Sequence, residues 1–341
     1  MTNKIASLRA VLCALTVCAL CVVGASTAWA ECSQTLKVGS LAPAGSDWHK
    51  AIESTGRKVK EQTGGEVCFK IYAGGTMGDE RAMIKKIRTG QLDVAVVTSV
   101  GLGDIDSSLL VLQVPLTFQS NKQLDYVREK MSGTFEKLLN DKGFSLLGWG
   151  DVGFNYLFSQ TPIATPNDAK QAGVKLWVWD ADPISKEVAK VAGISPVLLG
   201  VPDVLPSLST GVVNSYLNSP YGALALQWYG KTNHITDLKL AVTIGGTVIG
   251  KGTLDKLTPD QQKVLRAVAA EDHKALLTKV RSSNDSAQAA LVKKHGYTVV
   301  PVTDFAAWKK VADEVKTNLV GKVYSKALLD EMNGHLANAP K

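Results

Sequence analysis

The sequence predicts an α/β fold made of two similar units. Segments typical of strands alternate with segments typical of helices over residues 35–99, and again over residues 173–218. A single helical pattern of more than thirty residues follows, between Thr258 and Gly296. At 1.5 Å per residue that helix would extend roughly 50 Å. It is therefore expected to reach across more than one domain.

The first unit is predicted to have a β-α-β-α-β arrangement. Its elements are expected, in order, at residues 35–41, 46–65, 66–73, 79–90 and 92–99. The last of these is a nearly continuous apolar run, as expected of a parallel strand that is buried on both faces. Right-handed crossovers would place the three strands in one parallel sheet.

The second unit shows a similar alternation. A pair of strands is expected within residues 143–159, joined by a turn at Gly150–Gly153. The elements expected after this pair are strands and helices in alternation, at residues 173–179, 182–193, 195–200, 202–211 and 212–218.

The last third of the chain is expected to start with a strand-like segment, residues 238–252. The long helix then begins with Thr258 as N-cap, Pro259 at its first position and Gln261 completing a capping box. A short strand at residues 297–302 and two more helices are expected to complete the chain.

The first 30 residues are predicted to be a cleaved secretory signal peptide. Lys4 and Arg9 precede an apolar run, residues 11–23, and Ala28-Trp29-Ala30 fits the small-x-small pattern of signal peptidase sites. The run is short for a membrane span. An uncleaved N-terminal anchor is the alternative. Cleavage would leave 311 of the 341 residues, a length that suits two domains, and an exported protein is expected.

Cleavage would also change the cysteine content. Cys13, Cys18 and Cys21 would be removed, so that Cys32 and Cys68 remain. Two cysteines in an exported chain indicate one disulfide. Both precede or begin strands that we expect to be parallel neighbours, which would bring the sulfurs to the same end of the sheet. Two separate thiols are the alternative.

The charge and motif content exclude several functions. The mature chain would have a net charge of +5 without any block of Lys or Arg, so nucleic acid is not an expected partner. Gly245, Gly250 and Lys251 approach a phosphate-binding loop, but Gly252 replaces the Ser or Thr that would hold Mg²⁺. The five histidines are not paired at metal-ligand spacing, and no hydrolase motif is present. We expect no metal site, no cofactor, no catalytic residue and no enzymatic activity.

Residues 61–97 resemble the signature of the DctP family, the solute receptors of TRAP transporters. Further segments that resemble the family follow in order, at residues 112–118, 153–178, 205–220, 232–237 and 254–265. The resemblance implies an α/β type II periplasmic binding fold, with two lobes and a ligand cleft between them. Lobe I is expected to comprise residues 31–152 and about 240–265, and lobe II residues 153–239 and about 266–341.

The resemblance also implies a function and partners. Receptors of this family capture a small organic acid in the periplasm and deliver it to the subunits of a sodium-driven membrane permease. Ligand binding would close the two lobes by a hinge motion. We therefore expect a periplasmic, monomeric binding protein whose partners are a small molecule and a TRAP permease.

The sequence departs from the family where a carboxylate would bind. The family usually has the pattern Gly-x-Lys-x-Arg-Val, whose arginine forms a bidentate salt bridge with the ligand. Here the pattern starts at Gly173, and Trp177 occupies the arginine position. A second, frequently basic position is Asn155. A dicarboxylate is therefore not an expected ligand, because a desolvated dianion needs fixed cations.

Trp177 and Trp179 should lie on the same face of their strand, since strand side chains alternate. Their indole rings would offer a large flat apolar surface. We therefore expect a ligand with a substantial aromatic or aliphatic body and at most one carboxylate. The alternative is that both rings are core residues packed under a helix.

Further ligand contacts are expected at positions that match or neighbour the family pocket, which are Phe154, Asn155, Tyr156, Asn218, Tyr221 and Trp228. Trp48, beside Pro43, is expected to be either a lid-side contact or a packing residue at the helix start. Two alternatives for the function remain. One is a receptor for a neutral hydrophobic or lipid-like molecule that works with a helical-repeat partner, and the other is an exported enzyme that uses the same cleft.

Overall fold

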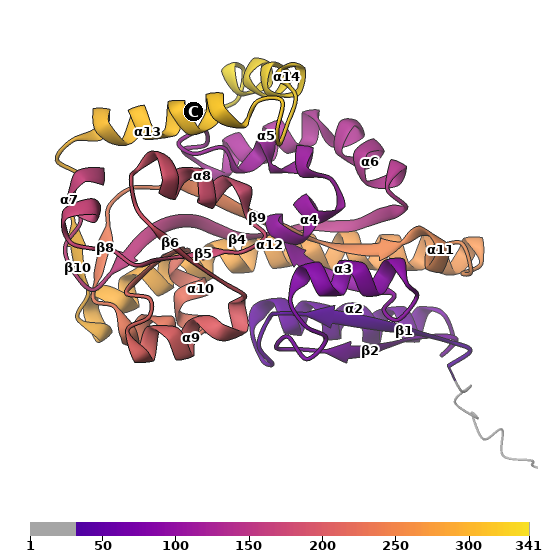
Figure 1. Ribbon diagram of the computed structural model, residues 1–341. Helices are drawn as coiled ribbons and strands as arrows, with labels where there is room; N and C mark the ends of the chain where they lie inside the picture. The colour runs from indigo at the N-terminus through magenta and orange to yellow at the C-terminus, as the bar shows by residue number, and fades with distance from the viewer. Residues whose placement is uncertain (1–31, 341) are drawn as a thin grey trace, which may run out of the picture.

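A computed structural model describes residues 32–340, which form one twisted sheet covered by helices (Figure 1). Eight strands follow the order β2-β1-β3-β9-β4-β7-β5-β6, and β8 and β10 are attached beside β4. The strands are β1 (Gln34–Ser40), β2 (Val67–Tyr72), β3 (Val94–Thr98), β4 (Phe144–Ser159), β5 (Leu176–Trp179), β6 (Pro196–Leu199), β7 (Ser215–Asn218), β8 (His234–Thr236), β9 (Ala241–Gly250) and β10 (Thr298–Val300).

The helices lie on both sides of this sheet and at its ends (Figure 1). They are α2 (Asp47–Gln62), α3 (Glu80–Arg88), α4 (Ser99–Ile105), η1 (Ser107–Gln113), α5 (Asn121–Lys130), α6 (Ser132–Asp141), α7 (Pro166–Gln171), α8 (Pro183–Val191), α9 (Val201–Thr210), α10 (Pro220–Ala225), η2 (Trp228–Lys231), α11 (Lys251–Leu254), α12 (Pro259–His295), α13 (Phe305–Leu319) and α14 (Lys326–Ala337). Within residues 32–340, every helix is too short or too polar to span a lipid bilayer. The predicted signal peptide, residues 1–30, lies outside the described residues.

The first half of the sheet has the predicted β-α-β-α-β arrangement. Strand β1 pairs in parallel with both β2 and β3. Ser46 caps α2 by accepting a hydrogen bond from the backbone N–H of His49, as its position before the helical pattern predicts. Thr35 of β1 lies opposite Cys68 of β2, and Cys68 forms a disulfide with Cys32. The predicted disulfide is confirmed.

Strand β4 is a single strand of 16 residues, so the predicted turn at Gly150–Gly153 is wrong. The glycines of β4 leave room for side chains that pack directly against the backbone of the strand. A Cβ at Gly150 would collide with the indole of Trp48, and a Cβ at Gly148 would collide with the imidazole of His273. The strand bends at a bulge between Asp151 and Gly153 instead of reversing.

The continuous strand β4 joins the two halves of the sheet. Its first part pairs with β9, and its last four residues, Tyr156–Ser159, pair with β7. Beyond β7, strand β5 pairs in parallel with β7 and with β6, as the alternating pattern of the second unit predicts. The predicted boundary between the lobes, at residues 152 and 153, falls on the bulge of β4. The division into two lobes stays a prediction.

The long helix α12 has 37 residues and runs along the sheet (Figure 1). Thr258 and Gln261 form the predicted capping box, and Gly296 ends the helix in the left-handed conformation. The helix packs on α2, β4 and α10, and therefore touches both halves of the sheet. The predicted single helix of more than thirty residues is confirmed.

Candidate ligand-binding site

A cavity of about 160 Å³ lies between the two halves of the sheet. The segments that follow β1 and β3 line it from the first half, and β5 and the end of β7 line it from the second half. All four regions lie at the carboxyl ends of parallel strands, where α/β folds generally bind their ligands. Strands β4 and β9 contribute Val152, Asn155 and Thr243 between the two halves.

Four of the six tryptophans within residues 32–340 line this cavity, namely Trp48, Trp177, Trp179 and Trp228. The ring centroids of Trp177 and Trp228 lie 4.9 Å apart in an edge-to-face arrangement, and those of Trp177 and Trp179 lie 6.1 Å apart. Both Trp177 and Trp179 are more than nine-tenths buried. These rings are therefore packed in the protein interior and also form a wall of the cavity.

The indole N–H groups of Trp48 and Trp177 are engaged within the protein. Trp177 donates its Nε1–H to the carbonyl oxygen of Leu199 over 3.1 Å. Trp48 donates its Nε1–H to the carbonyl oxygen of Asp151 over 3.3 Å. A solute in the cavity would consequently meet the apolar carbon surface of these rings, and not their hydrogen-bond donors.

The indole of Trp179 links the two halves of the sheet. Its Nε1–H donates to the carboxylate of Asp79 over 2.9 Å, and Asp79 is the N-cap of α3 on the opposite side of the cavity. The absence of a Cβ at Gly200 lets the carboxylate approach, since a Cβ there would meet it at 2.8 Å. Burial raises the pKa of Asp79, although hydrogen bonds from Glu80 and Trp179 oppose the shift.

No Lys, Arg or His is among the described residues that line the cavity. The carboxyl groups there are Glu80 and Asp182, both almost fully buried. Burial raises the pKa of Glu80 to about 8, against the hydrogen bonds from the backbone N–H groups of Thr98 and Gly101. Burial also raises the pKa of Asp182, which caps α8. The described wall therefore supplies no positive charge to a solute.

The structure brings together most of the residues predicted to contact a ligand. Those that line the cavity are Trp48, Asn155, Trp177, Trp179, Asn218, Tyr221 and Trp228. The phenol oxygen of Tyr221 accepts a hydrogen bond from the backbone N–H of Asp47 over 2.8 Å, which ties α10 to the start of α2. The amide of Asn155 donates to the hydroxyl of Thr243 over 2.7 Å.

Phe154 and Tyr156 do not line this cavity. They are the neighbours of Asn155 in β4, and successive strand residues point to opposite faces. Both line a separate hollow on the other face of β4. There the ammonium group of Lys239 lies 4.9 Å from the ring centroid of Phe154, and burial raises the pKa of Tyr156 to about 12.

Sequence reasoning did not identify Ser99, Gln113, Glu80 or Asp182, although all four line the cavity. A signal for Gln113 was present, because this polar residue interrupts an apolar run, residues 109–115. Ser99 is the last residue of the third predicted strand, at the end where α/β folds bind ligands. The two acids carried no such signal.

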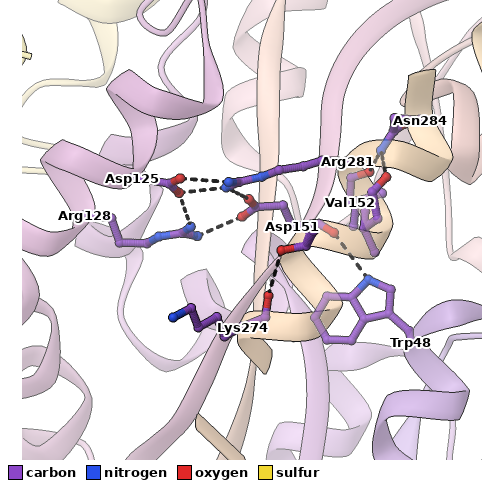
Figure 2. A network of polar contacts seen from close by, with 10 residues as sticks. Trp48, Asp125, Arg128, Asp151, Val152, Lys274, Arg281 and Asn284 are labelled. Atoms are coloured by element: carbon purple, nitrogen blue, oxygen red, sulfur yellow. Dashed lines mark hydrogen bonds and ion pairs between the residues drawn. The ribbon is translucent and has the colours of Figure 1, made fainter. Parts of the chain in front are cut away.

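Figure 2 shows an ionic network at β4, formed by Asp125, Arg128, Asp151 and Arg281. Asp151 and Arg281 line the same hollow as Phe154 and Tyr156. Asp151 is 1% exposed and accepts hydrogen bonds from Arg128 over 2.8 Å and from Arg281 over 2.9 Å. Asp125 accepts from the same two arginines, over 2.9 and 2.7 Å. Both guanidinium groups are thus paired with carboxylates.

The pKa shifts in the network have the directions that this pairing requires. Burial alone would raise the pKa of Asp125, but hydrogen bonds and charge from Arg281 and Arg128 bring it below its usual value. Burial would likewise lower the pKa of Arg281, but Asp125 and Asp151 raise it. Both groups are therefore charged at neutral pH, and the network is a set of compensated ion pairs.

The chain matches the family described as bacterial extracellular solute-binding protein, family 7 (DctP), over residues 38–322. A solute-binding protein of Chromohalobacter salexigens is 28% identical over 233 residues, which are 65% of this chain and 66% of that relative, just under two thirds of its length. The 2,3-diketo-L-gulonate-binding periplasmic protein of Escherichia coli K12 is 26% identical over 253 residues, 70% of this chain and 73% of that relative.

Solved structures share the fold. A TRAP periplasmic solute-binding protein from Ralstonia eutropha, with bound (S)-2-acetolactate, is 22% identical with a TM-score of 0.83 and covers 89% of this chain and 99% of its own. Another from Citrobacter koseri, with bound D-glucuronate, is 25% identical with a TM-score of 0.80 and covers 88% of this chain and 99% of its own. The chain belongs to the DctP family of bacterial extracellular solute-binding proteins.

Proposed function

We propose that the protein is the periplasmic solute receptor of a TRAP-type transporter and that its ligand has a sizeable aromatic or aliphatic body. One observation carries the second part of this proposal. The cavity has walls of tryptophan, and the described residues that line it include no basic side chain. Apolar ligand atoms gain free energy against such a wall, whereas a desolvated anion would lack a cation.

The ligands of related proteins make this contrast informative. The structural relatives from Citrobacter koseri and Ralstonia eutropha hold D-glucuronate and (S)-2-acetolactate, which are hydrophilic acids. In this chain, Trp177 and Asn155 occupy the two positions that the family resemblance assigns to basic residues. We infer that the ligand differs from those of the acid-binding relatives, and that it carries at most one carboxylate.

The proposed contacts divide by chemistry. Trp48, Trp177, Trp179, Tyr221 and Trp228 would hold the body of the ligand, since all five line the cavity. Asn155 and Asn218 would offer amide groups to its polar atoms. We do not extend the proposal to Phe154 and Tyr156, because they line the other hollow.

Closure of the two halves over the ligand would be part of this function. The hydrogen bond between Asp79 and Trp179 joins the halves directly beside the cavity. Such a contact would form in the closed state and separate when the receptor opens. The closed receptor would then present its surface to the membrane permease, as a monomer exported through the predicted signal peptide.

The proposal can be tested with four compounds: 4-phenylbutanamide, 4-phenylbutanoate, D-glucuronate and succinate. Binding is measured by isothermal titration calorimetry and by intrinsic tryptophan fluorescence. A receptor with an apolar site should bind at least one phenyl compound more tightly than both hydrophilic acids. Tighter binding of D-glucuronate or succinate than of both phenyl compounds would overturn the proposed ligand class.

The alternatives give different results in the same experiment. An exported enzyme would consume the bound compound, which chromatography of the mixture after prolonged incubation would detect. A receptor for lipid-like molecules would bind phenyl compounds with longer alkyl chains progressively more tightly. The limited volume of the cavity favours the small ligand over the lipid-like one.

A further inference from the structure

Three buried polar side chains at the cavity each have one atom without a hydrogen-bond partner. These atoms are the Oγ of Ser99, the Oε1 of Gln113 and the Oδ1 of Asn155. The side chains belong to residues that are only 1%, 4% and 7% exposed, and all three residues line the cavity. Most buried polar atoms in folded proteins have a partner, so three such atoms at one cavity indicate that a bound molecule supplies the partners.

The three residues lie on different elements that meet at the cavity. Ser99 begins α4, Gln113 ends η1, and Asn155 lies in β4. The tryptophans Trp177 and Trp179, by contrast, come from β5 in the second half of the sheet. The cavity therefore combines uncharged polar side chains from the first half and from β4 with the two tryptophans of β5 from the second half.

The neighbouring carboxyl groups restrict what these polar side chains can bind. Glu80 and Asp182 line the same cavity, and both already accept hydrogen bonds from the protein. An ionised carboxylate on the ligand has only acceptor atoms. It would therefore face the unpartnered oxygens of Gln113 and Asn155 without donating a hydrogen bond to them. A primary amide can satisfy all three side chains, because its two N–H groups can donate to Gln113 and Asn155 while its oxygen accepts from Ser99. A hydroxyl can accept from Ser99 and donate to one of the two amide oxygens.

We propose that Ser99, Gln113 and Asn155 bind an uncharged polar end of the ligand, a hydroxyl or an amide, and thereby discriminate against a carboxylate. This inference rests on the proposed function, because it names the chemistry of the same ligand. The aromatic wall then holds the apolar body, and the three polar side chains select the group at its end. The three residues are specificity-determining side chains, and no chemical step is involved.

The test compares 4-phenylbutanamide with 4-phenylbutanoate, which share the apolar body and differ in the charge of the polar end. Calorimetric titration at pH 7.5 should give an affinity for the amide that is roughly tenfold or more above that for the carboxylate. In the Ser99→Ala protein, the affinity for the amide should fall about fivefold, while that for the carboxylate should change less than twofold. Gln113→Leu should have an effect of the same direction.

The chain offers a matched control for Ser99. Ser215 is also fully buried and its hydroxyl also has no partner, but it does not line the cavity. Ser215→Ala should therefore leave both affinities within about twofold of the wild-type values. If Ser99→Ala and Ser215→Ala change the affinity for the amide equally, the polar assignment is wrong.

The outcomes separate this inference from the proposed function. Binding of 4-phenylbutanoate as tightly as, or more tightly than, the amide overturns the inference and leaves the apolar receptor standing. Binding of D-glucuronate with no binding of either phenyl compound overturns both. Failure of all the compounds to bind also counts against both, because the cavity would then lack affinity for the class that each proposal names.

Discussion

The two faces of strand β4 differ in the charged side chains that lie against them. On one face, Asp151 forms ion pairs with Arg128 and Arg281 at distances of 2.8 and 2.9 Å (Figure 2). On the other face, Val152 and Asn155 line a cavity whose described lining residues include no basic side chain. The bulge between Asp151 and Gly153 sets which residues point to each face.

This difference shows that the chain does not lack arginines close to the cleft. It holds them on the far face of β4, where carboxylates neutralise them. A buried guanidinium that is already paired has little free energy to offer to a ligand, because a new partner would have to displace an old one. We therefore expect the groups that remain unpaired at the cavity to determine the ligand class.

The largest expected effect comes from breaking the network on the charged face. Asp151→Ala removes a carboxylate that pairs with two arginines, and it should lower the free energy of unfolding by about 3–5 kcal/mol. Urea denaturation followed by circular dichroism measures the loss. Asp141→Ala, at the exposed Lys137–Asp141 pair, is the control and should cost only a few tenths of a kcal/mol. A loss below about 1 kcal/mol for Asp151→Ala would contradict a structural role for the network.

The second prediction places a cation in the wall of the cavity. Trp177→Arg removes part of the apolar wall and adds a guanidinium, so the affinity for 4-phenylbutanamide should fall roughly a hundredfold. Affinity for D-glucuronate should rise at the same time. Trp177→Phe, which retains an aromatic ring, is the control and should lose less than about tenfold. Unchanged binding of 4-phenylbutanamide by the Trp177→Arg protein would place the ligand elsewhere.

The third prediction concerns Glu80 and pH. Burial raises the pKa of this carboxyl group from 4.5 to about 8, so the folded protein favours the protonated form. The resulting stability is fully present below pH 4.5 and is lost as the pH rises through about 8. Between pH 5 and pH 7, the free energy of unfolding of the wild type should fall by about 2–3 kcal/mol more than that of Glu80→Gln. Urea denaturation at each pH measures both, and parallel pH profiles would contradict the shift.

The smallest expected effect concerns the contact that crosses the cavity. Trp179→Phe keeps an aromatic ring but removes the N–H that binds Asp79. It should lower ligand affinity about fivefold by destabilising the closed form. The control is Trp308→Phe, which loses a similar hydrogen bond to the carbonyl oxygen of Ala164. Neither Trp308 nor Ala164 lines the cavity, so this change should leave the affinity unchanged. Equal effects of the two changes would show that the contact has no role in closure.

The parts of the fold that depend on local patterns were predictable. The capping box at Thr258 and Gln261 and the αL glycine Gly296 defined the ends of α12, because these signals lie in the adjacent sequence. The export signal suggested that Cys32 and Cys68 are bonded, as they are. The continuity of β4 was not predictable, because the glycines that resemble a turn accommodate side chains from helices distant in sequence.

The candidate site was predictable where one strand supplied it and not where several elements meet. The shared face of Trp177 and Trp179 follows from the alternation of a single strand, and the family resemblance assigns position 177 to the ligand. Both residues line the cavity. Local alternation also excludes Phe154 and Tyr156 once Asn155 is known to face inward, but only the fold shows which face that is. The pairing of Arg128 in α5 with Asp151 in β4 depends on how the two elements meet in the fold, and no local pattern encodes it.

Native mass spectrometry of the protein purified from its host under gentle conditions tests the central claim most directly. The bound species should be a small molecule with an aromatic or aliphatic body, and Trp177→Arg should purify without it. A sugar acid or a dicarboxylate bound to the wild-type protein would contradict the claim.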